Sequence, residues 1–267
     1  MAGSEELAYR CMFDICCFIL SHLKMKRQFA GKCIHIINVM QRYTSSTRVQ
    51  TTGCLIIDKL ALNETLRPEL GASASVIVRL LRELASDDSI DSTSADASPG
   101  SRTSLLFHVM GAMSSLSLEC PSNVHALHEL GAAGALLDAI KPHFYAASGR
   151  EAHMTSAFLT CVSSLASQSA DMRDLFCCLG CCRMVKEAVV GREDDARVIR
   201  QASSCVVALL QGNAANVEYF KPEGDFLELI RRSGSAMADN YSVAVATRAA
   251  VQAVEEAVDM ASGQHGT

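Results

Sequence analysis

A pattern centred on a glycine recurs along this chain, and this repetition constrains the fold more than any other feature. An apolar residue often lies four positions before the glycine, and further apolar residues lie five, six or nine positions after it. The anchors are Gly31, Gly71, Gly131, Gly180 and Gly224. Their spacings of 40, 60, 49 and 44 residues are close to the period of helical repeats, which is about 40–47 residues. The longest gap indicates an insertion.

The residues around each anchor predict a short helix that turns into a second one. Asn63, Asn123 and Asn216 each lie eight residues before an anchor glycine. Asparagine is a favourable N-cap, because its side-chain oxygen accepts from the first free N–H groups of a helix. Glycine adopts a left-handed backbone without steric cost, so it can end the first helix and start the next. We therefore expect a helix, a glycine turn and a second helix in each copy.

A longer helical pattern follows each pair, with apolar residues three and four positions apart on one face. These patterns occupy Val49–Ala61, Ser104–Leu118, Met154–Ala166 and Val198–Leu210, with incomplete counterparts at Glu5–Ser21 and Ser242–Asp259. The sequence thus predicts an all-α, right-handed solenoid of about five repeats in one domain, residues 1–267. The expected parts are a partial repeat at 1–21, repeats at 22–61, 62–118, 119–166, 167–210 and 211–259, and a disordered tail at 260–267.

Two stretches resemble the armadillo repeat, a three-helix unit. NVHALHELGAAGALL at 123–137 looks like the junction of its first and second helices, and VQTTGCLIIDKLA at 49–61 looks like its third helix. The resemblance spans nearly the whole chain and points to no subfamily. It implies that the third helices line a concave groove and that the groove binds another macromolecule, which is an inference from fold alone.

Nuclear import receptors of the importin-α type carry a Trp, and an Asn four residues later, on each third helix. The Trp places here hold Leu55, Gly111, Thr160 and Ser204, and the Asn places hold Lys59, Ser115, Ser164 and Ala208. A receptor for nuclear-localisation signals is therefore not expected. The predicted groove is small, polar and mildly basic, and either it is merely solvated or it contacts a partner helix or an acidic segment. Its residues are Thr51, Leu55, Lys59, Phe107, Ser115, Ser156, Thr160, Ser164, Arg197, Arg200 and Ser204.

Charge and composition narrow the classes of function. The net charge is −5 and the basic residues are scattered, so nucleic-acid binding as the main role is not expected. Glu5 and Glu6 stand where a secretory leader carries basic residues, and no apolar stretch is long enough to cross a bilayer. Twelve cysteines in a core-rich chain indicate buried thiols. We expect a cytoplasmic protein, with nuclear and cytoskeletal locations as alternatives.

The most conspicuous run of potential metal ligands is Cys177, Cys178, Cys181 and Cys182, around the glycine of the fourth repeat. Cys-x-x-Cys pairs bind zinc or cycle as disulfides, but the chain holds no second, distant pair. Packing in the core is therefore the favoured interpretation, as it is for Cys16 and Cys17. His125 and His128 have a metal-capable spacing without a nearby third ligand. We expect no metal, no cofactor and no catalytic residue.

Two irregular segments interrupt the repeats. Residues 86–102 are acidic, rich in serine and low in complexity, which predicts a disordered loop, either a tolerated insertion or a phosphorylatable regulatory element. A shorter loop at 141–152 carries Phe144 and Tyr145, which either pack on a neighbouring repeat or take part in a contact.

Three functions are compatible with the sequence. The leading hypothesis is a non-catalytic scaffold or adaptor that binds proteins along the groove. A chaperone cofactor or a small-GTPase exchange factor of armadillo type is the alternative, and a metal or redox protein centred on Cys177–Cys182 is the third. The partial repeat leaves an apolar edge at Phe13, Cys17 and Leu20, which is self-capped, or covered by a partner or by another copy of the chain.

Overall fold

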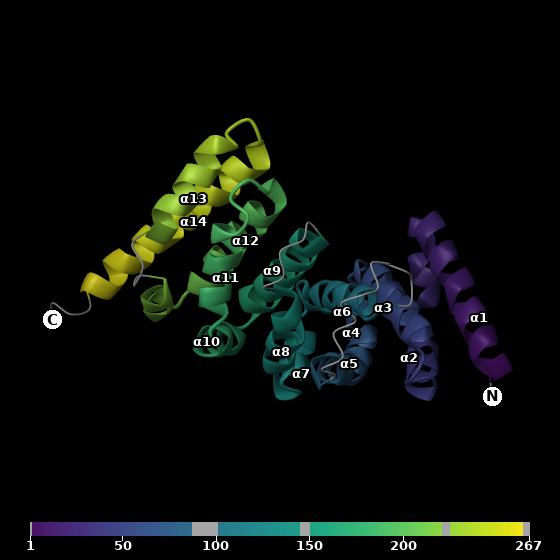
Figure 1. Cartoon of the computed structure of the whole chain (residues 1–267). Helices are drawn as coiled ribbons and strands as arrows, with labels where there is room; N and C mark the ends of the chain where they lie inside the picture. The colour runs from purple at the N-terminus through teal and green to yellow at the C-terminus, as the bar shows by residue number, and fades with distance from the viewer. Residues whose placement is uncertain (1, 87–100, 145–149, 221–224, 264–267) are drawn as a thin grey trace. The chain divides into compact units, whose positions relative to one another are not determined.

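The computed structural model describes residues 2–86, 101–144, 150–220 and 225–263, and these residues form helices without any strand (Figure 1). The helices are α1 (Ala2–Ser21), η1 (Leu23–Phe29), α2 (Cys33–Arg42), α3 (Thr47–Ala61), α4 (Arg67–Leu70), η2 (Gly71–Ser73), α5 (Ala74–Ser86), α6 (Arg102–Ser117), α7 (Pro121–Glu129), α8 (Ala132–Phe144), α9 (Arg150–Gln168), α10 (Ala170–Cys178), α11 (Cys181–Val190), α12 (Ala196–Leu210), η3 (Ala214–Tyr219), α13 (Asp225–Ala236) and α14 (Tyr241–Gly263). The all-α prediction and the six longer helices are confirmed.

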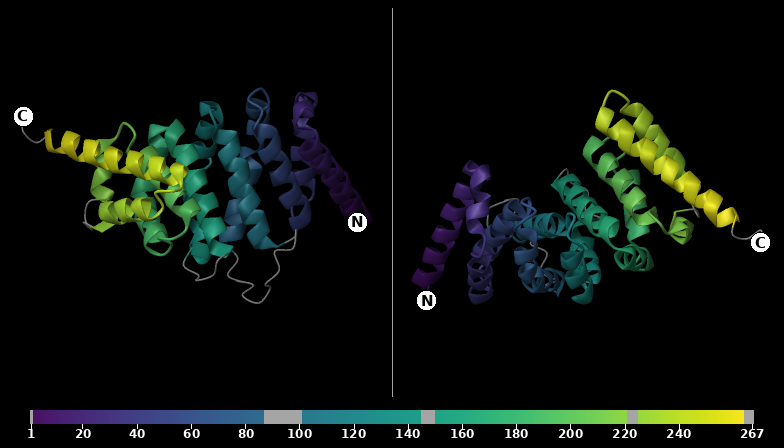
Figure 2. Two further views of the ribbon diagram at one scale, coloured as in Figure 1. Left: turned by 90° about the horizontal axis from the view of Figure 1, so that it is seen from above. Right: turned by 180° about the vertical axis from the view of Figure 1, so that it is seen from behind.

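The chain forms two compact units, Met1–Ala139 and Ile140–Thr267, where the sequence had suggested one domain. In the first unit α3 packs between α1 and α6, and in the second α12 packs between α9 and α14. Figure 2 shows these long helices side by side within each unit, purple to teal in the first and teal to yellow in the second. In both units a short helix and a helix of intermediate length precede a long one.

Side chains at the helix starts explain where several helices begin. Ser46 accepts from Val49 N at the start of α3, and Ser101 accepts from Ser104 N at the start of α6. Asp195 accepts from the backbone of Arg197 and Val198 at the start of α12. Each such cap satisfies an otherwise free N–H and contributes about 0.5–2 kcal/mol.

The anchor glycines fall into two classes. Gly31, Gly131 and Gly180 have φ of 73°, 73° and 84°, which confirms the predicted left-handed turn. Gly71 is right-handed, with φ of −54°, so the prediction is wrong there. A glycine is needed at position 71 for a steric reason instead, because a Cβ there would collide with the side-chain amide of Asn123. Gly224 lies outside the described residues.

The assignment of Asn123 and Asn216 as N-caps is also wrong. Cys120 is the N-cap of α7, and Asn123 is buried inside this helix. Its Nδ2 donates to Leu116 O, 3.0 Å away in the last turn of α6, and to Arg67 O at 2.9 Å. Asn216 Nδ2 donates likewise to Leu209 O of α12 at 2.9 Å. Asn63 behaves more nearly as predicted, since its Oδ1 accepts from Thr65 N just before α4.

Two arginines make the same kind of contact as these asparagines. Arg67 Nε donates to Ala61 O of α3 at 2.7 Å, and Arg173 Nη1 donates to Ala166 O of α9 at 2.9 Å. In all four cases a side chain on a short helix or 3₁₀ turn binds a carbonyl six or seven residues earlier, near the end of the preceding long helix. We call these four contacts the junction bonds. They satisfy carbonyls that a helix end leaves without a partner.

The irregular segments begin and end differently from the prediction. Ser86 belongs to α5, Ser101 caps α6 and Arg102 is its first residue, so helix occupies both edges of the predicted 86–102 loop, and residues 87–100 lie outside the described part. Helix also covers 141–144 and 150–152 of the predicted second loop. Phe144 is buried, and its ring meets Phe158 of α9 edge-on at 5.9 Å. Tyr145 lies outside the described residues. α14 extends to Gly263, into the expected tail.

Candidate functional site

The predicted groove residues of the first unit lie on α3 and α6, which pack against each other. Leu55 and Lys59 are half-buried, and Phe107 is 39% exposed. Thr51 and Ser115 are buried, so they are not part of an accessible surface, contrary to the prediction. Ser115 instead donates to a carboxylate oxygen of Asp58.

The groove residues of the second unit lie on α9 and α12, which also pack against each other. Arg197 and Arg200 are exposed, and Thr160, Ser164 and Ser204 are half-buried. Ser156 is buried, and its removal from the predicted surface is a third correction. Two of the hydroxyls are turned back onto their own helices: Thr160 Oγ1 donates to Ser156 O at 2.8 Å, and Ser204 Oγ donates to Arg200 O at 3.1 Å. The arginines therefore dominate the chemistry that this surface offers to a partner.

A charged cluster in the first unit was not predicted. Asp58 and Lys59 of α3 form an ion pair at 2.7 Å, and Asp58 also accepts from Ser115. Burial lowers the pKa of Lys26, with Lys59 acting in the same direction, and burial likewise lowers the pKa of His108 on α6. Lys59 lowers the pKa of both Lys26 and His108, and Asp58 raises it. The cluster thus combines one carboxylate with three basic groups.

Sequence reasoning missed Asp58, Lys26 and His108 because they come from three different elements, and no spacing along the chain relates them. One signal was available, since Asp58 is an acidic residue inside an apolar helical pattern. A largely buried carboxylate such as Asp58, whose side chain is 16% exposed, needs partners that donate hydrogen bonds or carry positive charge. Such partners are present in Lys59 and Ser115.

The second unit also holds a side-chain contact that was not predicted, between Arg197 and His153. Arg197 Nη1 lies within hydrogen-bonding distance of His153 Nδ1, which comes from the first turns of α9. Arg197 is a permanent donor, so the ring nitrogen of His153 accepts the bond. This contact holds the guanidinium at the start of α12 while Arg200, one turn later, stays exposed.

Three of the four cysteines in the run pack into the core as expected, and the prediction is wrong for Cys178. Cys177, Cys181 and Cys182 are buried and Cys178 is exposed, with Cys177 and Cys182 sulfurs 3.2 Å apart. A hydrogen bond to Cys177, together with burial, raises the pKa of Cys182, and a hydrogen bond to Cys205 raises that of Cys181. Thiols in this state are poor nucleophiles and poor metal ligands.

The paired cysteines of α1 and the two histidines singled out in the sequence differ in their exposure. Cys16 is buried, but Cys17 is exposed, so its placement in the core is wrong. His125 is exposed and His128 half-buried. Within the part of the chain that the structure describes, no group of three metal-ligating side chains gathers.

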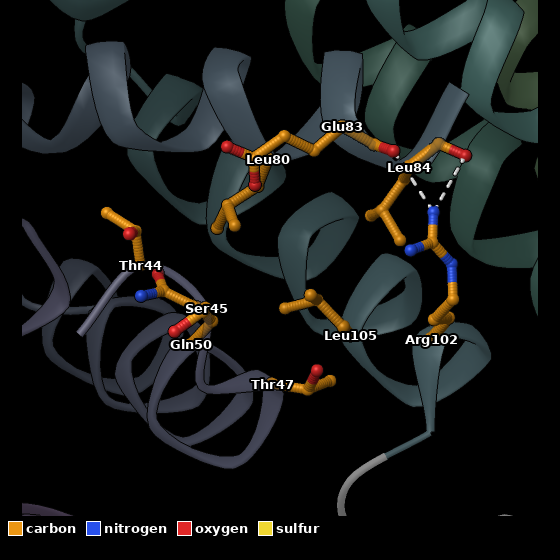
Figure 3. A pocket seen from close by; sticks show the side chains of 9 residues that line it. All are labelled: Thr44, Ser45, Thr47, Gln50, Leu80, Glu83, Leu84, Arg102 and Leu105. Atoms are coloured by element: carbon orange, nitrogen blue, oxygen red, sulfur yellow. Dashed lines mark hydrogen bonds between the residues drawn. The ribbon is translucent and has the colours of Figure 1, made fainter. Parts of the chain in front are cut away.

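A cavity of about 180 Å³ lies in the first unit between α5, the start of α6 and the segment from Thr44 to Gln50 (Figure 3). Hydroxyls of Thr44, Ser45 and Thr47 and the leucines at 80, 84 and 105 line it. Arg102 Nη2 donates to Glu83 O at 3.0 Å and to Leu84 O at 3.4 Å. Glu83 pairs with Arg79 at 2.7 Å. Arg102 therefore joins α6 to α5, whereas Glu83 pairs within α5.

Comparison with known proteins supports the fold and leaves the function open. A scan against models of protein families finds no match, and a search of curated proteins finds no similar sequence. The crystal structure of an engineered protein, a target of the Northeast Structural Genomics Consortium, is similar with a TM-score of 0.66 and 12% identity. The match covers 85% of this chain and 81% of that one. Among the described helices, none is long and apolar enough to cross a membrane.

Proposed function

We propose that this chain is a non-catalytic protein-binding scaffold, a right-handed α-solenoid of armadillo type that holds its partner against the long helices. One observation carries the proposal. In each unit the accessible predicted residues come from neighbouring long helices, Lys59 with Phe107 in the first and Thr160 with Arg200 in the second. A surface shared by successive helices suits an elongated partner better than a small substrate.

The chemistry of the exposed side chains indicates what the partner offers. Arg197 and Arg200 are one turn apart on α12 and exposed, and guanidinium groups bind carboxylates through paired hydrogen bonds. Leu55 and Phe107 provide apolar area in the first unit. An amphipathic helix or extended segment with acidic residues fits both features.

The test is affinity capture from the native cell with a charge-reversed variant. Lys59→Glu combined with Arg200→Glu places one negative charge on the proposed surface of each unit, and we expect the variant to lose a stoichiometric partner that the unchanged chain retains. Lys24→Glu combined with Arg183→Glu is the matched control, because both of its positions are exposed and lie off the long helices. Circular dichroism establishes that both variants are folded.

Two outcomes would overturn the proposal. Normal capture by the folded Lys59→Glu, Arg200→Glu variant would remove the long-helix surface as the binding site. Accelerated nucleotide release from a captured chaperone ATPase or small GTPase would replace the passive scaffold with an exchange factor.

A further inference from the structure

One face of α1 is unusually apolar for a surface that no described element covers. Met12, Cys16 and Ile19 on the opposite side are buried, and α1 packs on α3. The other large apolar side chains are exposed. Leu7 is 64% exposed, Phe13 50%, Phe18 39% and Leu20 46%, and the thiols of Cys11 and Cys17 are exposed with them. Several large apolar side chains exposed on one helix suggest an interaction site in soluble proteins.

Two opposite charges lie in the middle of this face. Arg10 and Asp14 are one helical turn apart, and both are exposed. At 100° per residue, the line from Arg10 to Asp14 divides the face. One side carries Phe13, Cys17 and Leu20, and the other side carries Leu7, Cys11 and Phe18. Arg10 Nε binds Glu6 at 2.9 Å.

The order of these charges selects a partner. In an antiparallel pair of α1 helices related by a two-fold axis at the level of Met12, each Arg10 lies opposite Asp14 of the other copy. The same axis brings each side of the face against the same side in the other copy. Phe13 then lies near Phe13, Cys11 near Cys11 and Leu7 near Phe18, so most apolar residues meet apolar residues, while Cys17 lies near Glu6. A parallel pair would instead place Arg10 against Arg10 and Asp14 against Asp14. Charge complementarity therefore favours the antiparallel, self-complementary arrangement.

We propose that this face of α1 binds α1 of a second copy of the chain, forming a two-fold dimer held by reciprocal Arg10–Asp14 pairs between flanking apolar residues. Half the surface of a helix 20 residues long, roughly 30 Å by 16 Å or about 500 Å² per copy, is the upper limit of the area that such a dimer buries. That area is at the low end for specific interfaces. The dimer is accordingly a reversible one, with a dissociation constant on the order of micromolar.

Charge reversal tests the proposal with the full chain. Arg10→Asp makes the centre of the face acidic and Asp14→Arg makes it basic, so each variant alone repels its own copy. Analytical ultracentrifugation should show each variant dimerising roughly tenfold or more weakly than the unchanged chain. An equimolar mixture of the two should form a heterodimer, and the double variant Arg10→Asp, Asp14→Arg should recover the homodimer.

The control is Arg183→Asp in the second unit, which breaks the comparable Arg183–Glu187 pair at 2.8 Å and should leave dimerisation unchanged. Circular dichroism checks that each variant is folded, and recovery by the mixture is independent of small losses of stability. Dimerisation of both single variants at the unchanged strength would overturn the proposal. So would an unchanged chain that stays monomeric well above micromolar concentration, or one that forms an open series of larger oligomers.

Discussion

The three asparagines that precede anchor glycines offer a quantitative test of the junction bonds. We expect Asn123→Ala to lower the free energy of unfolding by about 2–4 kcal/mol. It removes hydrogen bonds of 2.9 and 3.0 Å and leaves Arg67 O and Leu116 O without this donor in a buried place. Each net hydrogen bond is worth about 1 kcal/mol, and an unsatisfied buried group adds about 1–3 kcal/mol.

The other two asparagines provide a graded comparison. Asn216 makes one short bond, to Leu209 O, and a long one of 3.5 Å to Asp174, so Asn216→Ala should cost about 1–2 kcal/mol. Asn63 is half-exposed and its acceptor can be replaced by water, so Asn63→Ala should cost less than about 1 kcal/mol. The expected order is therefore Asn123, then Asn216, then Asn63.

Urea unfolding followed by far-UV circular dichroism measures the three costs. The slope of the transition should stay unchanged while its midpoint shifts. Amide hydrogen exchange should place the loss at Asn123 in the first unit and that at Asn216 in the second. Three equal costs near 1 kcal/mol would be the behaviour of three N-caps. That result, or a cost at Asn123 below that at Asn63, would refute the junction bonds as the role of these side chains.

Three further predictions follow from contacts elsewhere in the molecule. Glu69 accepts from the backbone N–H of Gly31 and Cys33, and these hydrogen bonds outweigh burial and lower its pKa. A lowered carboxyl pKa adds stability that is lost as the pH falls, so Glu69→Gln should lower the free energy of unfolding at pH 7. In urea titrations, the difference in stability between the variant and the unchanged chain should shrink below the ordinary carboxyl pKa of 4.5. Gly53→Ala should lower the free energy of unfolding by about 1–3 kcal/mol, because the added Cβ would lie 2.6 Å from Met40 Cγ. A double-mutant cycle with Met40→Ala should show that the second change relieves the clash. Strictly additive costs of the two changes would contradict this prediction. Iodoacetamide should label the exposed Cys17 within minutes and spare Cys182, because the hydrogen bond with Cys177, together with burial, raises the pKa of Cys182. Mass spectrometry of the folded protein checks this order, and equal labelling of the two thiols would contradict it.

The positions of the long helices could be predicted because they depend on local information. Apolar residues three and four positions apart define one buried face, and α3 and α12 begin and end within two residues of the expected bounds. The left-handed turns at Gly31, Gly131 and Gly180 could be predicted as well, since only glycine adopts this backbone conformation without strain. The role of Gly71 could not, because it depends on a side chain 52 residues later in the sequence.

The candidate site was harder to predict because small hydroxyl residues do not reveal their exposure. A serine or threonine in a helix can satisfy its own hydroxyl with the carbonyl four residues earlier. Ser117 does so with Met113 O while fully buried. Polarity alone therefore placed Thr51, Ser115 and Ser156 on a surface from which the structure removes them. Arginines are easier to place, since a buried guanidinium needs several partners, and Arg197 and Arg200 are exposed as expected.

The junction bonds also bear on how the chain folds. Each links residues only six or seven apart, so closing the loop between them costs little chain entropy, and the contact can form early in folding. We therefore expect a long helix and the short helix after it to be set at an angle before any neighbour has packed on them. Nascent chains could assemble such corners one after another during synthesis, and arginine and asparagine serve the purpose alike.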